Sequence, residues 1–231
     1  VVLVGKGVTF DTGGISIKPS AAMEEMKFDM AGAATVIGAI VAIARLKLKV
    51  NVVALVPATE NMPGGAAIKP GDIVTSMSGK TVEINNTDAE GRLILCDALT
   101  YGTTEYKPAA ILDVATLTGA CGIALGNIYS GLFTQNEKLA KASIAAADAT
   151  GERLWRLPLT DDYIEDMRGV YGDYSNMAFA KGGGASHGAA FLSQFIQNDV
   201  PWAHYDIATT AWNTGSRRVY KPDKGASGVR V

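Results

Sequence analysis

The sequence predicts an α/β fold, in which a mostly parallel central sheet is covered by helices. Short runs rich in Val, Ile and Leu alternate with longer helical stretches along the whole chain, as in parallel α/β proteins. Some of these runs are almost continuously apolar, which is typical of strands buried on both faces. With 231 residues, of which 48% are apolar and 19% charged, the chain is long enough to bury a sizeable core.

The first part of the chain predicts a strand, a helix and a second strand. Residues 1–4 read Val-Val-Leu-Val and predict a buried strand. Residues 31–46 carry apolar or small side chains almost all round, so we expect a buried helix, in which Gly32 and Gly38 let another backbone approach. Residues 50–56 form a near-continuous apolar run, which favours a central parallel strand.

The middle of the chain predicts a hairpin, a helix and a strand. Residues 74–84 alternate around a Ser-Gly pair, which favours a hairpin turn. The run Gly79-Lys80-Thr81 is similar to the end of a phosphate-binding loop, but Val74 stands where that motif needs its first glycine. The hairpin is therefore the better interpretation. Residues 91–102 predict a helix, and residues 109–114 the strand that follows it.

The last part of the chain continues the same alternation. Residues 137–149 predict a polar-faced helix, residues 189–197 another helix, and residues 202–207 a strand. In parallel sheets, ligands collect at the loops beyond the carboxyl ends of the strands. We therefore expect the chemistry in the segments that follow strands.

Composition excludes several functional classes. A net charge of −2 lacks the basic surface of a nucleic-acid-binding protein. No apolar run reaches the roughly 18 residues that cross a bilayer, so no membrane association is expected. Cys96 and Cys121 stand among apolar neighbours and favour a reducing, cytoplasmic setting over a disulfide framework. His187 and His204 are too few for a histidine-rich zinc site, so any metal must have other ligands.

Charged side chains stand in glycine-rich, otherwise apolar segments. They are Lys6, Asp11, Lys18, Asp29, Asp88, Glu90 and Arg92. Some have simple structural explanations: Asp29 could cap the helix after it, Asp11 could shape a turn, and the lysines could be solvated. Asp88 and Glu90 are harder to explain, because residues two apart do not share a helix face and neighbouring buried carboxylates repel. A cation between them would remove that repulsion.

The charges of this set indicate metal and anion binding. The four carboxyl groups would balance two divalent ions, and Lys6 could join them as a neutral amine ligand. Such oxygen-rich ligation admits Mn²⁺, Mg²⁺ or Zn²⁺. Arg92 falls in the first turn of the expected helix, where a bound anion would offset the unfavourable dipole; a plain surface arginine is the alternative. The spacing alone therefore indicates a two-metal hydrolase.

Five segments carry a family resemblance. They are residues 4–14, 26–34, 86–93, 115–120 and 202–208, and the third reads Asn-Thr-Asp-Ala-Glu-Gly-Arg-Leu. In this order they resemble the leucine aminopeptidases of the M17 type, the cytosol aminopeptidases, which are manganese- or zinc-dependent exopeptidases. The resemblance implies a three-layer αβα fold of the zinc-exopeptidase kind, with a mixed, mostly parallel sheet.

The resemblance also implies an incomplete domain. Residues 1–231 would be a catalytic aminopeptidase domain without the family's N-terminal domain and without the start of the catalytic domain. Residues 1–4 and 225–231 look like parts of elements, which agrees with this expectation.

The resemblance assigns roles to single residues. The metal ligands would be Lys6, Asp11, Asp29, Asp88 and Glu90, with Asp11 and Glu90 bridging two ions. Lys18 would polarise the scissile carbonyl group, and Arg92 would hold a bicarbonate-like anion that acts as general base. The backbone at Ala89, Gly91 and Leu117 would complete the anion cradle. Met26, Thr116, Leu117 and Gly119 would line the substrate pocket.

His187 lies where the family more often has an Ile-Thr pair. We interpret it as a residue at the start of a helix or at the pocket rim, and not as a metal ligand.

The implied function is the release of N-terminal leucine and other apolar residues from peptides, by a hydroxide that two Mn²⁺ or Zn²⁺ ions activate. The substrates would be peptides with a free N-terminus, and the assembly a cytoplasmic hexamer of two stacked trimers. Two alternatives stay open: a two-metal amidohydrolase or phosphoesterase, and a non-catalytic regulatory module on the same fold. The apolar pocket and Lys18 favour peptides over phosphates, and the presence of all five ligand residues speaks against a non-catalytic module.

Overall fold

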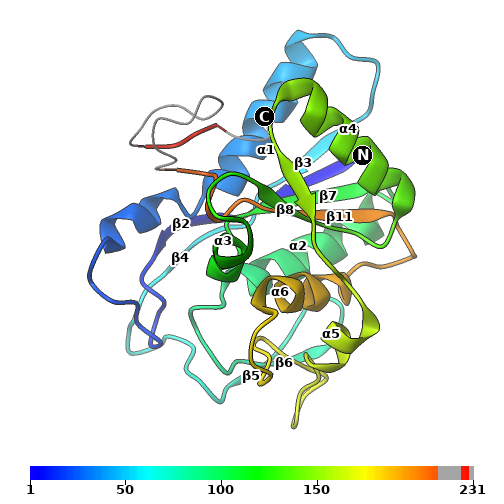
Figure 1. The fold of residues 1–231 in the computed structure, drawn as a ribbon. Helices are drawn as coiled ribbons and strands as arrows, with labels where there is room; N and C mark the ends of the chain where they lie inside the picture. Colours follow the sequence, from blue (N-terminus) through cyan, green and yellow to red (C-terminus); the bar gives the residue numbers. More distant parts are fainter. Residues whose placement is uncertain (213–224, 229–231) are drawn as a thin grey trace.

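The computed structural model describes residues 1–212 and 225–228, and it contains a six-stranded sheet with helices on both faces (Figure 1). The strands in sheet order are β3 (Val53–Leu55), β1 (Val2–Gly5), β7 (Ile111–Ala115), β11 (Trp202–Asp206), β8 (Ser130–Phe133) and β9 (Leu154–Arg156). Of the terminal segment 225–231, residues 229–231 lie outside the described residues.

The sheet is mixed and mostly parallel, as the sequence predicts. The strands β3, β1, β7 and β11 run parallel, β8 is antiparallel to β11, and β9 is parallel to β8. Strand β1 pairs with β3 on one side and β7 on the other, so the chain order reverses at β1. In open α/β sheets such a switch point opens a crevice at the carboxyl ends of the strands.

Helices cover the sheet in two layers, which makes the fold a three-layer αβα arrangement (Figure 1). On one face lie α1 (Ala31–Arg45) and α4 (Glu137–Thr150). On the other lie α2 (Gly91–Glu105), α3 (Gly119–Leu125), α5 (Asp161–Glu165) and α6 (Gly184–Ser193). The main core lies under the second layer, with Leu99, Ile111, Phe133, Phe191 and Phe195 fully buried.

Smaller elements flank the carboxyl ends of the central strands. A parallel pair is formed by β2 (Gly7–Asp11) and β4 (Ala58–Asn61). A three-stranded sheet contains β10 (Tyr174–Ser175), β6 (Thr81–Glu83) and β5 (Ile73–Thr75). The antiparallel pair β5–β6 confirms the predicted hairpin, and Gly79 in its turn has a φ of 84°. A 3₁₀ helix, η1 (Met23–Phe28), precedes α1.

Two expectations about burial on the α1 side are wrong. The run at residues 50–56 forms β3 at the edge of the sheet, where Val50 and Val56 are exposed, and is not a central strand. Helix α1 is buried only in its first half, since Ile37 and Val41 are 51% and 44% exposed. An apolar run shows that a segment can be buried, but the position of the segment in the sheet decides how much of it is covered.

The helix predicted at residues 189–197 is displaced. Helix α6 begins at Gly184 and ends at Ser193, because Gly183 adopts a left-handed conformation with a φ of 64° and starts the helix there. Glycine has a low helix propensity, so the three consecutive glycines at 182–184 did not indicate that a helix begins there.

By length and composition alone, one stretch of the described residues, Met23–Arg45, could cross a membrane. It consists of η1 and α1 separated at Asp29 and Met30, and α1 packs against β1 and β7. Core helices of water-soluble proteins pass the same test.

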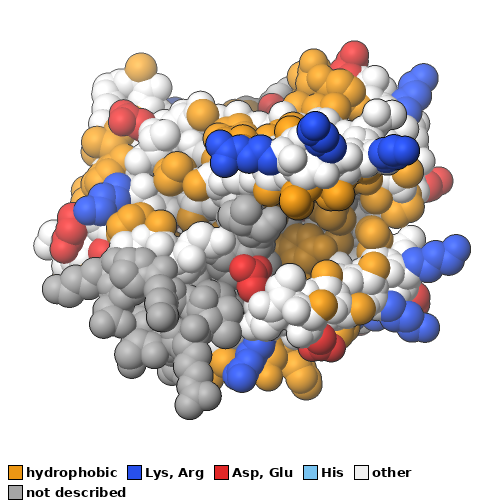
Figure 2. Space-filling view, turned by 90° about the horizontal axis from the view of Figure 1, so that it is seen from above, with side chains coloured by type: hydrophobic (Ala, Val, Ile, Leu, Met, Phe, Trp, Pro, Cys, Tyr) orange, Lys and Arg blue, Asp and Glu red, His pale blue; other side chains and the backbone are white. Residues whose placement is uncertain are grey.

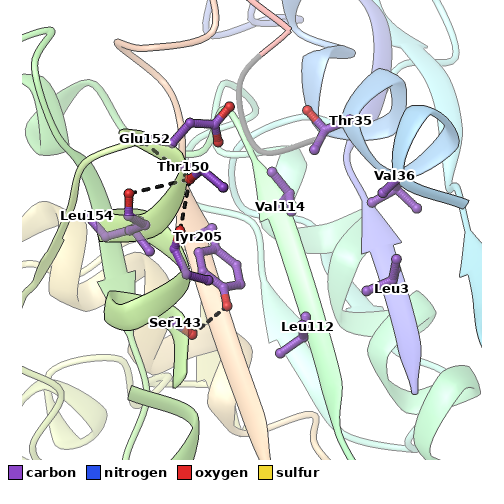
Figure 3. A pocket seen from close by; sticks show the side chains of 13 residues that line it. Leu3, Thr35, Val36, Leu112, Val114, Ser143, Thr150, Glu152, Leu154 and Tyr205 are labelled. Carbon is purple, nitrogen blue, oxygen red and sulfur yellow. Dashed lines mark hydrogen bonds between the residues drawn. The ribbon is translucent and has the colours of Figure 1, made fainter. Parts of the chain in front are cut away.

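A groove opens on the sheet face between α1 and α4. Its volume is about 290 Å³, and its wall is mostly apolar, with Leu3, Val36, Leu112 and Val114 from α1 and the central strands (Figure 3). The Ser143 and Tyr205 hydroxyl groups hydrogen-bond there at 2.7 Å. Seen from above, hydrophobic side chains line a hollow in the surface (Figure 2). The groove wall contains none of the predicted site residues.

Gly32 is expected to be intolerant of any side chain. A Cβ atom there would lie 2.1 Å from the Val114 carbonyl oxygen and 2.9 Å from the Lys6 nitrogen, and both are backbone atoms. Gly32→Ala should therefore lower the free energy of unfolding by about 1–3 kcal/mol or more, as measured by urea denaturation. Gly64→Ala is the matched control, because nothing lies within 4 Å of that position. Equal stability of the two variants would contradict the close packing of α1 on β1 and β7.

Candidate metal centre

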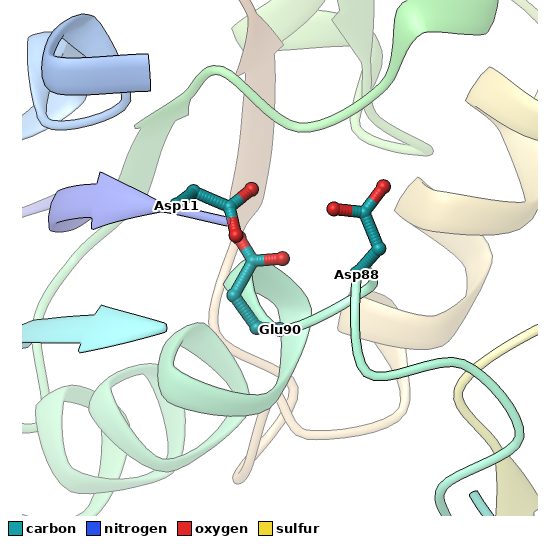
Figure 4. A group of neighbouring side chains, drawn as sticks. All are labelled: Asp11, Asp88 and Glu90. Carbon is teal, nitrogen blue, oxygen red and sulfur yellow. The ribbon is translucent and has the colours of Figure 1, made fainter. Parts of the chain in front are cut away.

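The predicted ligand residues converge at the carboxyl ends of β1 and β2. Lys6 follows β1, Asp11 ends β2, and Asp29 lies between η1 and α1. Asp88 and Glu90 belong to the segment that leads into α2. Carboxylate oxygens of Asp11, Asp88 and Glu90 all lie within 4.8 Å of one another (Figure 4). The fold thus brings together segments that are far apart in the sequence.

Lys6 is the buried centre of one half of this cluster. Its Nζ atom lies 2.9 Å from Asp29 Oδ1 and 2.8 Å from Glu90 Oε1, and it donates a hydrogen bond to the Thr116 carbonyl oxygen at 2.8 Å. Burial alone would lower the pKa of Lys6, but Asp29 and Glu90 outweigh burial and raise it. Without a metal, Lys6 is therefore an ammonium group that neutralises two carboxylates.

Gly91 makes room for the Lys6 side chain. A Cβ atom on Gly91 would lie 2.5 Å from Lys6 Cε and 2.7 Å from Lys6 Nζ. The glycine after Glu90 thus leaves the space that the end of the lysine side chain occupies.

Asp29 faces the cluster and does not cap α1. Met30 is the N-cap residue, and Asp29 Oδ1 instead accepts a hydrogen bond from Thr116 Oγ1 at 2.6 Å. Burial raises the pKa of Asp29 to about 7, and Glu90 adds to this rise while Lys6 opposes it. The capping explanation of Asp29 is excluded by this geometry.

Lys18 serves the other half of the cluster. Its Nζ atom lies 2.8 Å from Asp11 Oδ2 and also contacts Asp88 Oδ1. Burial lowers the pKa of Lys18, whereas its hydrogen bonds to Asp11 and Asp88 raise it, with a net rise. Burial raises the pKa of Asp88 in spite of the Lys18 contact. Asp11 is held from its other side, since its Oδ1 accepts hydrogen bonds from Gly13 N at 2.9 Å and Asn61 Nδ2 at 2.8 Å.

The cluster has the donor set of a cation site. Within the described residues, Oδ2 of Asp29 and Oε2 of Glu90 are enclosed and accept no hydrogen bond. Four carboxyl groups share the two ammonium groups of Lys6 and Lys18. Enclosed carboxylate oxygens without donors are costly unless a cation or a proton compensates them. These residues therefore fit divalent metal ions.

Arg92 supplies a positive charge beside the cluster. It lies in the first turn of α2 and is buried, and its Nη1 donates to the Asn176 carbonyl oxygen at 2.7 Å. Its enclosed Nε has no hydrogen-bond partner within the described residues. Burial lowers the pKa of Arg92 to about 10, although Glu90 and Asp206 counteract this. A guanidinium group with a free donor at a helix N-terminus is suited to hold an anion.

A cavity of about 290 Å³ adjoins Asp88 and Arg92. Its wall consists of Asn86, Asp88, Ala89, Arg92, Leu117, Thr118, Gly119, Ala120, Met177, Ala178, Ala180, Gly182, Gly184 and His187. The cavity is therefore continuous with the cluster and with α6.

Only some of the residues predicted for the substrate pocket and the anion cradle lie in the wall of this cavity. Leu117, Gly119 and Ala89 line the cavity. Met26 is half-buried in η1 and lies outside its wall, as does Thr116, whose hydroxyl group bonds Asp29. The Leu117 N–H group, expected in the anion cradle, donates to Asp206 Oδ1 at 3.2 Å.

The two histidines lie apart from the carboxylate cluster. His187 lies in the first turns of α6, in the cavity wall. His204 is fully buried in β11, where its Nδ1 lies 2.6 Å from Asp113 Oδ1.

Three positioning residues were not singled out in the sequence. Asn61, at the end of β4, bonds Asp11 and the Thr87 carbonyl oxygen. Asn176 accepts hydrogen bonds from the backbone of Asn85 and Asn86 through Oδ1. Asp206, at the end of β11, accepts hydrogen bonds from the loop after β7. Polar residues at strand ends were the signal that could have identified Asn61 and Asp206.

Comparisons with known proteins agree on one family. The family described as "Cytosol aminopeptidase family, catalytic domain" matches residues 1–231. The chain is 58% identical over 231 residues to a probable cytosol aminopeptidase of Bdellovibrio bacteriovorus, covering 100% of this chain and 46% of that protein. It is 57% identical to a probable cytosol aminopeptidase of Acidovorax sp. (strain JS42), covering 100% of this chain and 45% of that protein. The chain thus spans less than half the length of these curated relatives.

Solved structures give the same result. The bottromycin maturation enzyme BotP in complex with Mn superposes with a TM-score of 0.92 at 41% identity, covering 98% of this chain and 50% of that one. A second BotP structure has a TM-score of 0.89 at 40% identity, covering 98% of this chain and 49% of that one.

Proposed function

The chain belongs to the cytosol aminopeptidase family, and we propose from this that residues 1–231 are the catalytic domain of a metal-dependent aminopeptidase. The observation that carries the proposal is the buried cluster of four carboxyl groups around Lys6 and Lys18. A neighbour of the same fold was solved in complex with Mn. The substrates are peptides with a free N-terminus, and leucine and other apolar residues are preferred at that end.

The five clustered residues divide into two metal sites. Lys6, Asp11, Asp29 and Glu90 would hold one ion, and Asp11, Asp88 and Glu90 would hold the other. The enclosed oxygens of Asp29 and Glu90 that accept no hydrogen bond support cation binding at this cluster. When bound, two Mn²⁺ or Zn²⁺ ions supply an activated water and polarise the substrate carbonyl group. Lys6 must lose its proton to become a ligand, so metal binding releases a proton from it.

Lys18 and Arg92 have the two remaining roles in the proposed reaction. Lys18 holds its proton and donates it as a hydrogen bond to the oxygen of the scissile carbonyl group, where negative charge develops. Arg92 would hold a bicarbonate-like anion through its free Nε donor, and such an anion would supply a general base beside the scissile bond. Ala89, Gly91 and Leu117 surround that anion.

In this proposal, single residues are removed from the N-terminus because the cluster selects a free amine. A free amine would be held at the metal ions, and Met26, Thr116, Leu117 and Gly119 would receive the first side chain. We further propose that the protein acts in the cytoplasm as a homo-oligomer, a hexamer of two stacked trimers.

A substrate comparison tests the proposed function. The chain, loaded with Mn²⁺, is assayed with leucine p-nitroanilide and, in parallel, with p-nitrophenyl phosphate. We expect release of p-nitroaniline and no phosphate ester cleavage, because the cavity beside Asp88 is lined mostly by apolar and small residues. Turnover of the phosphate ester alone would replace the proposal by a two-metal phosphoesterase.

A further inference from the structure

His187 is a buried polar side chain that the proposed chemistry does not use. It is 4% exposed and contributes to the wall of the cavity that also contains Asp88 and Arg92. Its Nε2 lies 2.9 Å from Asp166 Oδ2, and Asp166 is not part of that wall. One nitrogen of the ring is therefore turned away from the cavity and held.

The surrounding chain fixes the orientation of the His187 ring. Tyr163 packs edge-on against it, with ring centroids 5.2 Å apart. On another side lies Gly183, whose φ of +64° and missing side chain leave space for the ring. A Cβ atom at this glycine would lie 3.3 Å from His187 Cε1 and 3.0 Å from Tyr163 Cε1. The ring is thus pre-positioned before any ligand arrives, which lowers the entropy cost of binding.

The second ring nitrogen is an open hydrogen-bond acceptor. Asp166 accepts the hydrogen of Nε2, so in the neutral imidazole Nδ1 carries a lone pair and no hydrogen. Nδ1 has no partner within the described residues, and it is not among the enclosed polar atoms, whereas His204 Nε2 is. The small exposed fraction of His187 therefore includes an acceptor without a donor.

The position of His187 in the cavity wall indicates which part of a bound substrate would contact His187. Under the proposed function, the first residue of the peptide lies toward Met26 and Gly119. The cavity wall includes Gly119 but not Met26, and it runs from there to Gly184 and His187. We infer that His187 is a specificity-determining residue whose Nδ1 accepts a hydrogen bond from the side chain of the leaving residue. This inference rests on the proposed aminopeptidase function.

The inference predicts a preference between two isosteric substrates. The side chain of Leu-Asn can donate a hydrogen bond to Nδ1, whereas the carboxylate of Leu-Asp can only accept one. The charge of Leu-Asp meets Asp88, Arg92 and the metal ions equally in every variant, so the informative quantity is the change of the ratio of kcat/KM values between variants. A single neutral hydrogen bond corresponds to about a three- to tenfold change in that ratio.

Two substitutions separate this role from a structural one. His187→Gln keeps a donor near the position of Nε2 and hence the contact with Asp166, but it removes Nδ1. His187→Asn keeps an acceptor near the position of Nδ1 and gives up the contact with Asp166. At about pH 8, we expect the Leu-Asn to Leu-Asp ratio to fall about three- to tenfold in His187→Gln and to stay within about twofold of the wild type in His187→Asn. A purely structural role would produce the reverse order of the two variants, or no change in either.

Nitrogen NMR tests the contact without requiring turnover. The chain has only two histidines, and His204 is fully buried, so ¹⁵N-histidine labelling gives one reporter and one internal reference. Addition of a Leu-Asn analogue with a reduced peptide bond should shift the Nδ1 signal of His187, and the Leu-Asp analogue should not.

The outcomes separate the two claims. A shift without hydrolysis of any leucine substrate would overturn the proposed function and keep the His187 contact. Hydrolysis with an unchanged ratio and no shift would overturn the inference about His187 alone. If neither hydrolysis nor a shift is observed, both claims fail.

Discussion

Replacing Asp88 by alanine is expected to remove one of two bound divalent ions and to lower kcat/KM for leucine p-nitroanilide by about a thousandfold or more. Carboxylate oxygens of Asp88, Asp11 and Glu90 lie within 4.8 Å of one another. In the proposed assignment, Asp88 is a ligand of only one ion, the ion that Lys6 does not contact. Metal content by elemental analysis and initial rates on the same preparation measure both effects.

Asp148→Ala is the matched control for this change. Asp148 is exposed on α4, on the opposite face of the sheet from α2. We expect it to keep both ions and activity within about twofold of the wild type, as for most surface substitutions. Asp88→Ala with two ions and undiminished turnover would show that Asp88 is not a ligand.

Replacing Lys6 by methionine should destabilise the metal-free protein strongly. Methionine fills a similar volume, but it leaves Asp29 and Glu90 buried without the ammonium group that now lies 2.9 and 2.8 Å from them. Breaking a buried ion pair from one side costs about 3–5 kcal/mol. Urea denaturation in the presence of a chelator measures this loss. Lys141→Met on the exposed face of α4 is the control and should stay within about 0.5 kcal/mol of the wild type.

The pH dependence of this loss has a definite sign. Burial already raises the pKa of Asp29 to about 7, and Lys6 opposes that rise, so the pKa in Lys6→Met must be higher still. Because the pKa in the folded state exceeds that in the unfolded state, folding takes up a proton and stability falls as pH rises through the folded pKa. The variant should therefore lose more stability at about pH 8 than at about pH 5. A loss that is independent of pH would contradict the account of Lys6 as counter-ion of Asp29.

Most of the fold could be predicted from local patterns. Helices α2 and α4 and strands β1, β7 and β11 lie close to their predicted ranges, because their apolar periodicity reflects burial directly. The edge position of β3 and the exposed half of α1 could not be predicted. They depend on which strands pair, which is a property of the whole sheet.

In the candidate site too, some residues could be predicted from the sequence and others could not. Unusual charged residues in glycine-rich loops identified Lys6, Asp88 and Glu90, because such residues are expensive to bury without a partner. The partners themselves were not visible in the sequence. Asp206 bonds a loop almost 90 residues away, and Asp166, directly after α5, holds His187 of α6. Such contacts arise only from tertiary packing.

The central claim is that this chain binds two divalent ions at Lys6, Asp11, Asp29, Asp88 and Glu90. Elemental analysis of the purified chain, after loading with Mn²⁺ or Zn²⁺ and removal of free metal, tests it most directly. The account predicts two ions per chain. A chain that folds, shown by a cooperative unfolding transition, and retains no metal would contradict it.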